Sequence, residues 1–429
     1  MKPIQPTVLT RRHHAIAVVA EKTAGWQHGT VQAVQQHKAM RVFRRLIAAF
    51  LIGLAASSAA AADDARSTAK VIGAYFPSGS ANRYPISQIP AGKLTHLFYA
   101  FATIEDGRCV AKSPDASEHF AALAELKRKH PRLRTLISIG GWSAGGFSDA
   151  ASTARSRRRF VDSCVALFFD THRGSFDGVD IDWEYPVYGG PPEIGARLQD
   201  RRNMTLMARE FRRQLSKVGQ KRGQAFQLTA ALPAGRMQST GPYDPTLSYE
   251  LAELAEVLDF INLMTYDMGT AFSMVASFNA PLHEVAEDPL GKPMRRWNNV
   301  AGAIDYYQQQ GVPAHKLVLG VPFYGRGYLV SSEANHGLYQ PYTSAFAPGN
   351  WRDIKKVLLS DPQWEQHWHP VAQTPWLFHR GERKFVSYED PKSIGIRAQL
   401  AKDRGLLGVF MWELTGDDEQ HSLLDAMVR

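Results

Sequence analysis

Short apolar runs alternate with longer amphipathic stretches along the chain from residue 70 to the C-terminus. The short runs are rich in β-branched and aromatic residues, as is typical of parallel strands that are covered on both faces. We predict eight such strands, over residues 70–76, 94–102, 134–139, 176–184, 226–232, 258–266, 316–323 and 406–412. Helical periodicity lies between them and is clearest over residues 116–130, 153–170, 204–219, 300–310 and 393–404. Eight strand–helix units predict an α/β fold, a (β/α)8 TIM barrel, with a doubly wound open sheet as the alternative.

One interval breaks this alternation. About 80 residues separate the seventh predicted strand from the eighth, where a single helix would suffice. The excess falls in residues 327–386, which are rich in aromatic side chains. We therefore predict a small α+β subdomain, inserted between strand 7 and strand 8 on the rim of the barrel.

The composition is that of an ordinary globular protein, with 429 residues of which 44% are hydrophobic and 21% charged. The net charge of +9 is concentrated near the N-terminus: residues 1–62 hold eight Lys and Arg against one acid, a balance of +7 that leaves +2 for the rest. Nucleic acid is therefore not an expected partner. The length fits one barrel with an insertion, and we expect a monomer.

The N-terminal segment has the parts of a secretory signal peptide. A basic segment at residues 40–45 precedes an apolar run at 46–58, and three alanines at 60–62 offer a small-residue cleavage site. The apolar run is shorter than the ~20 residues that cross a bilayer, which argues against a transmembrane helix. We therefore predict a leader over residues 1–62, with Met40 as the expected start, and a catalytic domain over 63–429. This organisation predicts a secreted or periplasmic protein without membrane attachment after cleavage.

The chain has two cysteines, Cys109 and Cys164. An exported protein can form a disulfide, but a barrel of this size buries enough core to need none. Cys164 lies on an apolar helical face, so we expect a buried free thiol there and keep a single disulfide as the alternative.

Three carboxylates occupy alternate positions in the fourth predicted strand. Because side chains of a strand alternate between its two faces, Asp180, Asp182 and Glu184 point the same way. Like charges crowded in a partly dry site repel each other, which raises carboxyl pKa values and so favours a general acid at neutral pH. The carboxyl ends of barrel strands are also where catalytic groups lie. The pattern therefore predicts a catalytic site at this strand end.

The pattern Asp177-x-x-Asp180-x-Asp182-x-Glu184 resembles the signature of glycoside hydrolase family 18, the chitinases and their relatives. The resemblance extends from residue 70 to the C-terminus, because further family motifs lie at the ends of other predicted strands. They are Ser138, Gly140 and Gly141 after the third strand, Met264, Tyr266 and Asp267 after the sixth, Tyr324 and Arg326 after the seventh, and Trp412 at the end of the eighth. The resemblance implies hydrolysis of β-1,4-linked N-acetylglucosamine in chitin or chito-oligosaccharides.

The resemblance also implies a retaining mechanism in which the acetamido oxygen of the substrate is the nucleophile. In such a mechanism Glu184 is the proton donor, Asp182 orients the acetamido group, Asp180 tunes Asp182, and Tyr266 holds the acetamido carbonyl. Sugar contacts are implied for Trp412, Trp142, Phe101, Met264, Asp267, Tyr324, Arg326 and Tyr185, and structural support for Asp177, Ser138, Gly140 and Gly141. No cofactor and no metal is expected.

Two positions depart from the family pattern. Many relatives carry an aromatic residue directly after the first-strand glycine, whereas here Ala74 follows Gly73, so either a contact is missing or Tyr75 supplies it. Phe272 stands where relatives often have a tryptophan, which suggests weaker binding on the product side.

Other functions stay open at this point. An endo-β-N-acetylglucosaminidase acting on N-glycans, or an enzyme acting on lipo-chitooligosaccharides or peptidoglycan, would use the same chemistry. A chitinase-like lectin typically lacks the acidic glutamate, whereas Glu184 is present together with the three aspartates. A metal-dependent barrel hydrolase would need histidines clustered with acids near strand ends, and the 15 histidines are scattered.

Overall fold

The computed structural model describes residues 70–234, 245–292 and 294–429. The predicted leader, its cleavage site and Met40 lie outside the described residues. No helix within the described ranges is long and apolar enough to cross a membrane.

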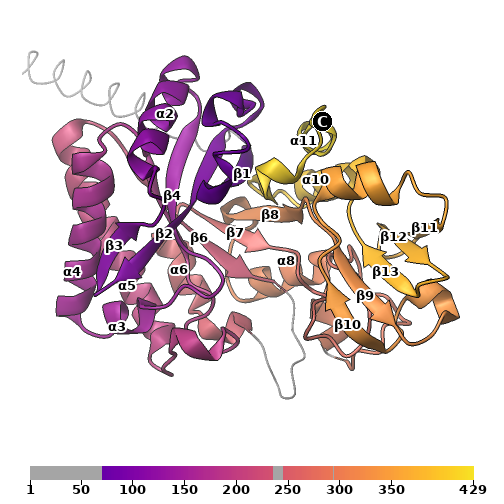
Figure 1. Cartoon of the computed structure of the whole chain (residues 1–429). Coiled ribbons are helices and arrows are strands. Elements are labelled where there is room, and N and C mark those ends of the chain that lie inside the picture. The colour runs from indigo at the N-terminus through magenta and orange to yellow at the C-terminus, as the bar shows by residue number, and fades with distance from the viewer. Residues whose placement is uncertain (1–69, 235–244, 293) are drawn as a thin grey trace, which may run out of the picture. The chain divides into compact units, whose positions relative to one another are not determined.

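Eight parallel strands form a closed barrel (Figure 1). They are β1 (Val71–Pro77), β2 (His96–Glu105), β4 (Arg134–Gly140), β5 (Gly178–Asp182), β6 (Gln227–Pro233), β7 (Phe260–Met264), β8 (Leu317–Pro322) and β14 (Gly408–Trp412). Consecutive barrel strands lie side by side, and β1 pairs with both β2 and β14, which closes the ring. The predicted (β/α)8 barrel is confirmed, and the open sheet is wrong.

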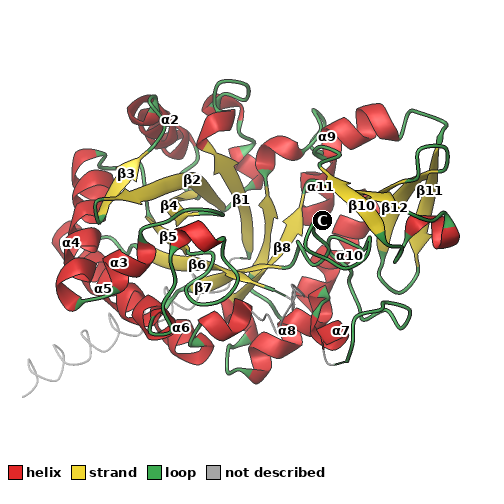
Figure 2. Cartoon of the chain, turned by 60° about the horizontal axis from the view of Figure 1, so that its bottom comes forward, coloured by secondary structure: helices red, strands yellow, loops and turns green. Residues whose placement is uncertain are grey.

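Helices surround the barrel strands (Figure 2). The longer ones are α2 (Ala116–Lys129), α4 (Ala154–Val165), α5 (Asp200–Arg222), α8 (Val300–Gln309) and α10 (Pro391–Asp403), and the shorter ones are α3 (Phe147–Ala151), α6 (Leu251–Val257), α7 (Met294–Trp297), α9 (Trp351–Asp353) and α11 (Ser422–Val428). Three of them begin with a capping box, formed by Thr153 with Ser156 at α4, by Asn350 with Asp353 at α9 and by Asp390 with Ser393 at α10. Such caps satisfy the backbone N–H groups that a first helical turn leaves unpaired.

Two strands end two residues earlier than the sequence predicts. β5 ends at Asp182 and β7 ends at Met264, so Glu184 and Tyr266 each lie two residues beyond a strand. Asp182 is the last residue of β5 that pairs with β4. Both side chains therefore belong to the loops that follow the strands, at the end of the barrel where the chain leaves the sheet.

The interval between β8 and β14 contains a five-stranded antiparallel sheet (Figure 1). Its order is β10 (Tyr342–Phe346), β9 (Arg326–Val330), β13 (Lys384–Ser387), β12 (Thr374–His379) and β11 (Trp364–His369). The subdomain has its own apolar cluster, which includes Tyr328, Phe378 and Phe385. Phe278 joins this cluster from the segment between β7 and α8. The predicted α+β insertion is confirmed. The segment between β7 and α8 also packs into the insertion, which the sequence did not indicate.

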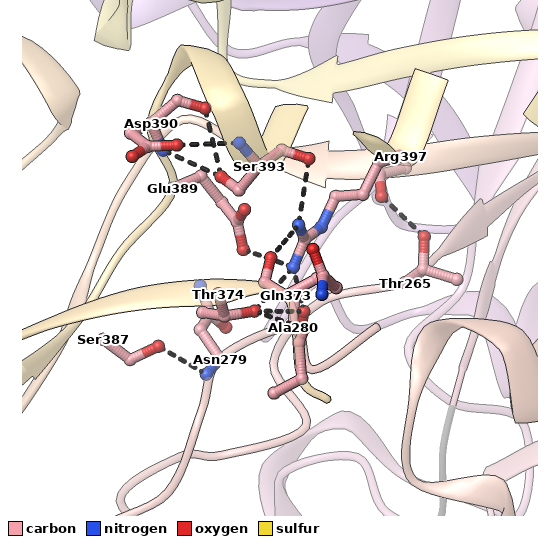
Figure 3. Close-up of polar contacts among 12 residues, drawn as sticks. Thr265, Asn279, Ala280, Gln373, Thr374, Ser387, Glu389, Asp390, Ser393 and Arg397 are labelled. Carbon is pink, nitrogen blue, oxygen red and sulfur yellow. Dashed lines mark hydrogen bonds and ion pairs between the residues drawn. The ribbon is translucent and has the colours of Figure 1, made fainter. Parts of the chain in front are cut away.

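A buried arginine of the barrel helix α10 makes an ion pair just before that helix and hydrogen bonds to the insertion (Figure 3). Arg397 of α10 lies 2.8 Å from Glu389, and both side chains are almost fully buried. Arg397 also donates hydrogen bonds to the Thr374 hydroxyl at 2.9 Å and to the backbone oxygens of Gln373 and Ala280. One guanidinium thus fixes β12, the segment after β7, and the start of α10 to one another.

Cys109 and Cys164 form a disulfide, so the expected free thiol is wrong. Cys109 lies in β3 (Arg108–Ala111), which pairs with the far end of β2 as an antiparallel hairpin. The hairpin lies against α4, where the Cys109 N–H donates to the Ser163 hydroxyl at 2.9 Å. The disulfide joins positions 55 residues apart, and the helical pattern around Cys164 does not indicate it.

Candidate active site

A cleft of about 630 Å³ opens at the carboxyl end of the barrel strands. It is lined by most of the residues singled out from the sequence, namely Glu184, Asp182, Tyr266, Trp412, Trp142, Phe101, Met264, Asp267, Tyr324, Arg326 and Tyr185. These residues come from the ends of six different strands and the loops that follow them. Parallel strands of a barrel end at one face, which is why residues far apart in sequence meet there.

Asp180 lies beneath the cleft, fully buried in the barrel. Its carboxylate accepts hydrogen bonds from Tyr75 and Ser138 at 2.8 Å, from Thr229 at 2.6 Å and from Asn262 at 3.4 Å. Burial raises the pKa of Asp180, and these four donors oppose that effect by stabilising the ionised form. The arrangement places a buried carboxyl group with four hydrogen-bond donors below Asp182.

Asp182 and Glu184 form a hydrogen-bonded carboxyl pair in the cleft. Burial raises the pKa of Glu184 to about 7, with the charge of Asp267 acting in the same direction. Burial, together with the charges of Glu184 and Asp180, raises the pKa of Asp182 well above its usual range. Two adjacent carboxyls cannot easily ionise together, so the pair retains a proton near neutral pH.

The two oxygens of Asp182 differ in their hydrogen bonds. Asp182 shares a hydrogen bond with Glu184. Its Oδ1 atom is buried and without a hydrogen-bond partner among the described residues. A buried carboxyl oxygen without a partner is costly. This atom is therefore positioned to receive an N–H or O–H group from a ligand.

A second polar group lies on the side of the cleft formed by β7 and β8. Asp267 accepts hydrogen bonds from the Tyr324 hydroxyl and from Arg326 Nε, both at 2.8 Å. The Asp267 backbone N–H donates to the Asn279 side chain at 2.8 Å, which fixes this residue in a left-handed conformation with φ of 58°. Tyr266 lies beside Tyr324, with ring centroids 6.2 Å apart. The group presents a hydroxyl, a carboxylate and a guanidinium to the cleft.

Aromatic rings form the apolar part of the cleft. The ring of Trp412 stacks on Phe101, with centroids 5.6 Å apart and 20° between planes, and tilts against Tyr75 at 5.6 Å. Trp142 is 49% exposed and contacts Tyr185 edge to face at 6.3 Å. A pyranose has an apolar face that packs on such rings while its hydroxyls reach polar groups. Trp412 thus forms a floor of the cleft that Phe101 and Tyr75 support, whereas Trp142 lies at the rim.

Two glycines after β4 leave room for the Asp182 backbone and the Phe101 ring. A side chain at Gly140, where φ is +124°, would place its Cβ 1.9 Å from the Asp182 carbonyl oxygen. A side chain at Gly141 would meet the Phe101 ring at 2.7 Å.

Asp177 lies at the other end of β5, where it pairs with Lys127 at 2.9 Å and accepts a hydrogen bond from the Thr135 N–H at 2.9 Å. The structure thus separates Asp177 from the cleft and brings the other acids of its motif together.

Several residues of the cleft carry no signal in the sequence. Asn350, Gly349 and Ala347 reach it from the insertion. They are brought there by backbone pairing, because the Gly325 N–H donates to the Gly349 oxygen at 3.0 Å. Further lining residues are Ala231, Pro233, Ala234, Thr270 and Ala271. Tyr75, the alternative for the contact that Ala74 lacks, and Phe272, which stands where relatives often have a tryptophan, both line the cleft as well.

Within the described ranges, one group of side chains has metal-ligand spacing, formed by His336, Glu365 and His367. None of these three residues lines the cleft.

Comparison with known proteins gives one family. The family model for glycosyl hydrolases family 18 matches residues 71–417. Chitinase A1 of Niallia circulans is 33% identical over 411 residues, which cover 82% of this chain and 57% of that protein. Chitotriosidase-1 of Mus musculus is 33% identical over 330 residues, which cover 76% of this chain and 67% of that protein. A structure of a family 18 N-acetylglucosaminidase from Paenibacillus barengoltzii matches with a TM-score of 0.73 at 31% identity and covers 84% of this chain and 99% of that one.

Proposed function

Because the chain belongs to glycosyl hydrolase family 18, we propose that it is a chitinase in which Glu184 is the proton donor. Its substrate would be chitin or chito-oligosaccharides, cleaved at β-1,4 linkages between N-acetylglucosamine units. The observation that carries the proposal is the hydrogen-bonded pair of Asp182 and Glu184, in which the buried Oδ1 atom of Asp182 has no partner among the described residues. An acetamido N–H of the substrate would supply the partner that this oxygen lacks.

The reaction then follows from the two carboxyls. Glu184 gives its proton to the glycosidic oxygen as the bond from that oxygen to C1 breaks, and the acetamido oxygen bonds to C1 to form an oxazolinium ring. Water next attacks C1 and opens the ring, and its proton passes to the Glu184 carboxylate, which restores the acid. Asp182 stabilises the positive charge on the oxazolinium ring, and the nearby carboxyl of Asp180 also favours this positive charge. Two inversions at C1 leave a β-anomer.

Other residues of the cleft would place the sugar for this reaction. Tyr266 holds the acetamido carbonyl, and Asp267 with Arg326 binds neighbouring hydroxyls. Trp412 supports the distorted sugar from below, and Trp142 is a platform on the leaving-group side. The insertion, which contributes Ala347, Gly349 and Asn350 to the cleft, supports a linear polymer as substrate.

Export of the protein from the cytoplasm is part of the same proposal. The chain spans 57% of the length of Chitinase A1. The basic and apolar segments before residue 63 support export, which would bring the enzyme to a polymer outside the cytoplasm.

A second candidate is an N-acetylglucosaminidase that releases single sugars, and the similarity to the Paenibacillus barengoltzii enzyme favours it. It would use the same acid and the same nucleophile. It would differ in removing one unit at a time from a chain end.

One set of digestions tests these proposals. The protein is mixed with chitohexaose, cellohexaose and a high-mannose glycoprotein, and the products are followed by NMR of the new reducing ends. We expect β-anomers from chitohexaose, no cleavage of cellohexaose, and release of dimers or trimers. Monomers alone would indicate the N-acetylglucosaminidase, and released N-glycans an endo-β-N-acetylglucosaminidase. Initial α-anomers, or brisk cleavage of cellohexaose, would overturn the substrate-assisted mechanism.

The Glu184→Gln variant tests the proton donor. Its amide keeps the shape of the side chain and cannot give the proton, so kcat should fall at least ~10²-fold while binding of chito-oligosaccharide persists. Activity within a few-fold of the wild type would show that another group is the acid.

A further inference from the structure

We propose that the insertion binds a divalent transition-metal ion of the zinc class at His336, Glu365 and His367. One possible ligand atom from each residue lies within 4.8 Å of the others. Glu365 Oε2 is 2.9 Å from Nδ1 of His336 and 3.3 Å from Nε2 of His367. Ligand atoms at about 2.0–2.2 Å from a tetrahedral zinc are about 3.4 Å apart, so small side-chain movements would complete the site.

The fold holds these three side chains toward one another. Glu365 and His367 occupy alternate positions of β11 and therefore share one face of the sheet. The His367 ring stacks on Trp376 of β12, with centroids 4.8 Å apart and 23° between planes. His336 reaches the same place from a turn, and its ring centroid lies 4.0 Å from that of His367.

The turn that carries His336 is fixed in an unusual conformation. Asn335 and His336 both have left-handed backbones, with φ of 50° and 48°. This conformation is unfavourable for residues that have a Cβ atom, so the surrounding structure must hold it in place. Part of that support comes from Trp376, whose indole N–H donates to the His336 carbonyl at 3.3 Å.

The carboxylate of Glu365 has the outer contact that metal-binding carboxylates usually have. Arg380 Nε donates to Oε1 at 3.1 Å, and Arg380 Nη2 approaches Oε2 at 3.5 Å. Arg380 is itself paired with Glu333 at 3.0 Å, which offsets its positive charge near the site. Oε2 is thus the oxygen that faces both histidines, while Oε1 is held from outside.

The chemistry of the ligands indicates the class of ion. Two imidazole nitrogens and one carboxylate oxygen suit Zn²⁺ and its neighbours, whereas Ca²⁺ and Mg²⁺ prefer oxygen alone. Three protein ligands leave one position for water. Because the site lies outside the catalytic cleft, its role would be to join the turn at residues 334–337 to β11, the edge strand of the inserted sheet.

Zinc titration of the metal-free protein tests the proposal. The full chain is treated with EDTA and dialysed, ZnCl2 is added under calorimetry, and Tm is measured with and without zinc. We expect one ion per chain and a rise in Tm. The variants His336→Asn and His367→Gln should bind zinc at least about 100-fold more weakly. Loss of an outer contact of a zinc ligand alone lowers metal affinity about 10- to 100-fold, and these variants remove a ligand itself. Asparagine tolerates the left-handed backbone of position 336, so the first variant should keep the turn.

His315→Ala is the matched control, since this histidine is exposed on the barrel and belongs to no metal cluster among the described residues. Histidines near the N-terminus are common to all variants, so a difference between variants reports the insertion alone. The control should bind like the wild type, and His336→Asn should keep its hydrolytic activity. Equal affinity and stoichiometry for the wild type and the His336→Asn/His367→Gln double variant would overturn the proposal, as would a wild type that binds no zinc.

Discussion

The protonation of Glu184 is set by its immediate neighbours. Burial is the largest cause of its raised pKa, and the negative charge of Asp267 adds to it. Asp182 opposes this effect through a hydrogen bond. A general acid works best when its pKa lies near the working pH, and a value of about 7 meets that condition.

This electrostatic arrangement predicts the pH profile. Glu184 must carry its proton at the start of the reaction, so kcat/KM should fall as the pH rises above about 7. In Asp267→Asn the charge that raises the pKa of Glu184 is gone, so this alkaline limb should move to lower pH. The variant should also lose about 10-fold in kcat/KM because one hydrogen-bonding group for sugar is weakened. A limb that stays in place or moves upward would contradict the assigned cause.

The two tryptophans of the cleft differ in their surroundings. Trp412 is stacked on Phe101 and contacts Tyr75, whereas Trp142 is half exposed at the rim. A ring that supports the distorted sugar acts mainly in the transition state, while a rim platform binds substrate and transition state alike.

We therefore expect Trp412→Ala to lower kcat on a soluble oligomer by about 10²-fold and Trp142→Ala mainly to raise KM. Steady-state kinetics of both variants on chitohexaose provides the measurement. Equal losses of kcat, or a larger loss in Trp142→Ala, would contradict the assignment of Trp412 as the ring that supports the distorted sugar.

At the scale of elements, Arg397 of α10 holds the insertion against this helix and pairs with Glu389 just before the helix. Both partners are buried, and the guanidinium also serves carbonyl oxygens of two other segments. Burial raises the pKa of Glu389 to about 7, against the opposing effect of Arg397. Removal of one partner would leave a buried charge without compensation.

We expect Arg397→Met to lower the free energy of unfolding by about 3–5 kcal/mol, as is typical when one partner of a buried pair is removed. The double variant Glu389→Gln/Arg397→Met should lose less than the sum of the two single changes, because no charge then remains buried. Urea unfolding of the four proteins gives the comparison. Additive losses would show that the pair is not coupled.

At the scale of the whole molecule, the Cys109–Cys164 disulfide joins the β2–β3 hairpin to α4 across 55 residues. Neither cysteine lines the cleft. A cross-link of this kind acts mainly by restricting the unfolded chain.

We expect the Cys109→Ala/Cys164→Ala variant to lose about 2–4 kcal/mol of stability and to retain wild-type kcat. Dithiothreitol should lower the Tm of the wild type toward that of the variant and leave the variant unchanged. An equal response of both proteins to the reductant would mean that the disulfide contributes nothing.

The sequence alone determined the barrel and the centre of the candidate site. Buried parallel strands leave a continuous apolar run, and eight such runs with helices between them predict a (β/α)8 barrel, with the open doubly wound sheet as the alternative that the structure then excluded. The alternation of side chains along one strand placed Asp180 and Asp182 together, because that relation depends only on adjacent residues. The position of Glu184 two residues beyond β5 was missed, since apolar pattern does not mark where pairing stops.

Contacts between distant segments were decided only by the tertiary structure. The disulfide depends on how a hairpin lies across α4, and the approach of Asn350 to the cleft depends on backbone pairing with the end of β8. The grouping of His336 with Glu365 and His367 likewise requires a turn to fold over an edge strand. Such relations arise from packing among many residues, so no local period in the sequence records them.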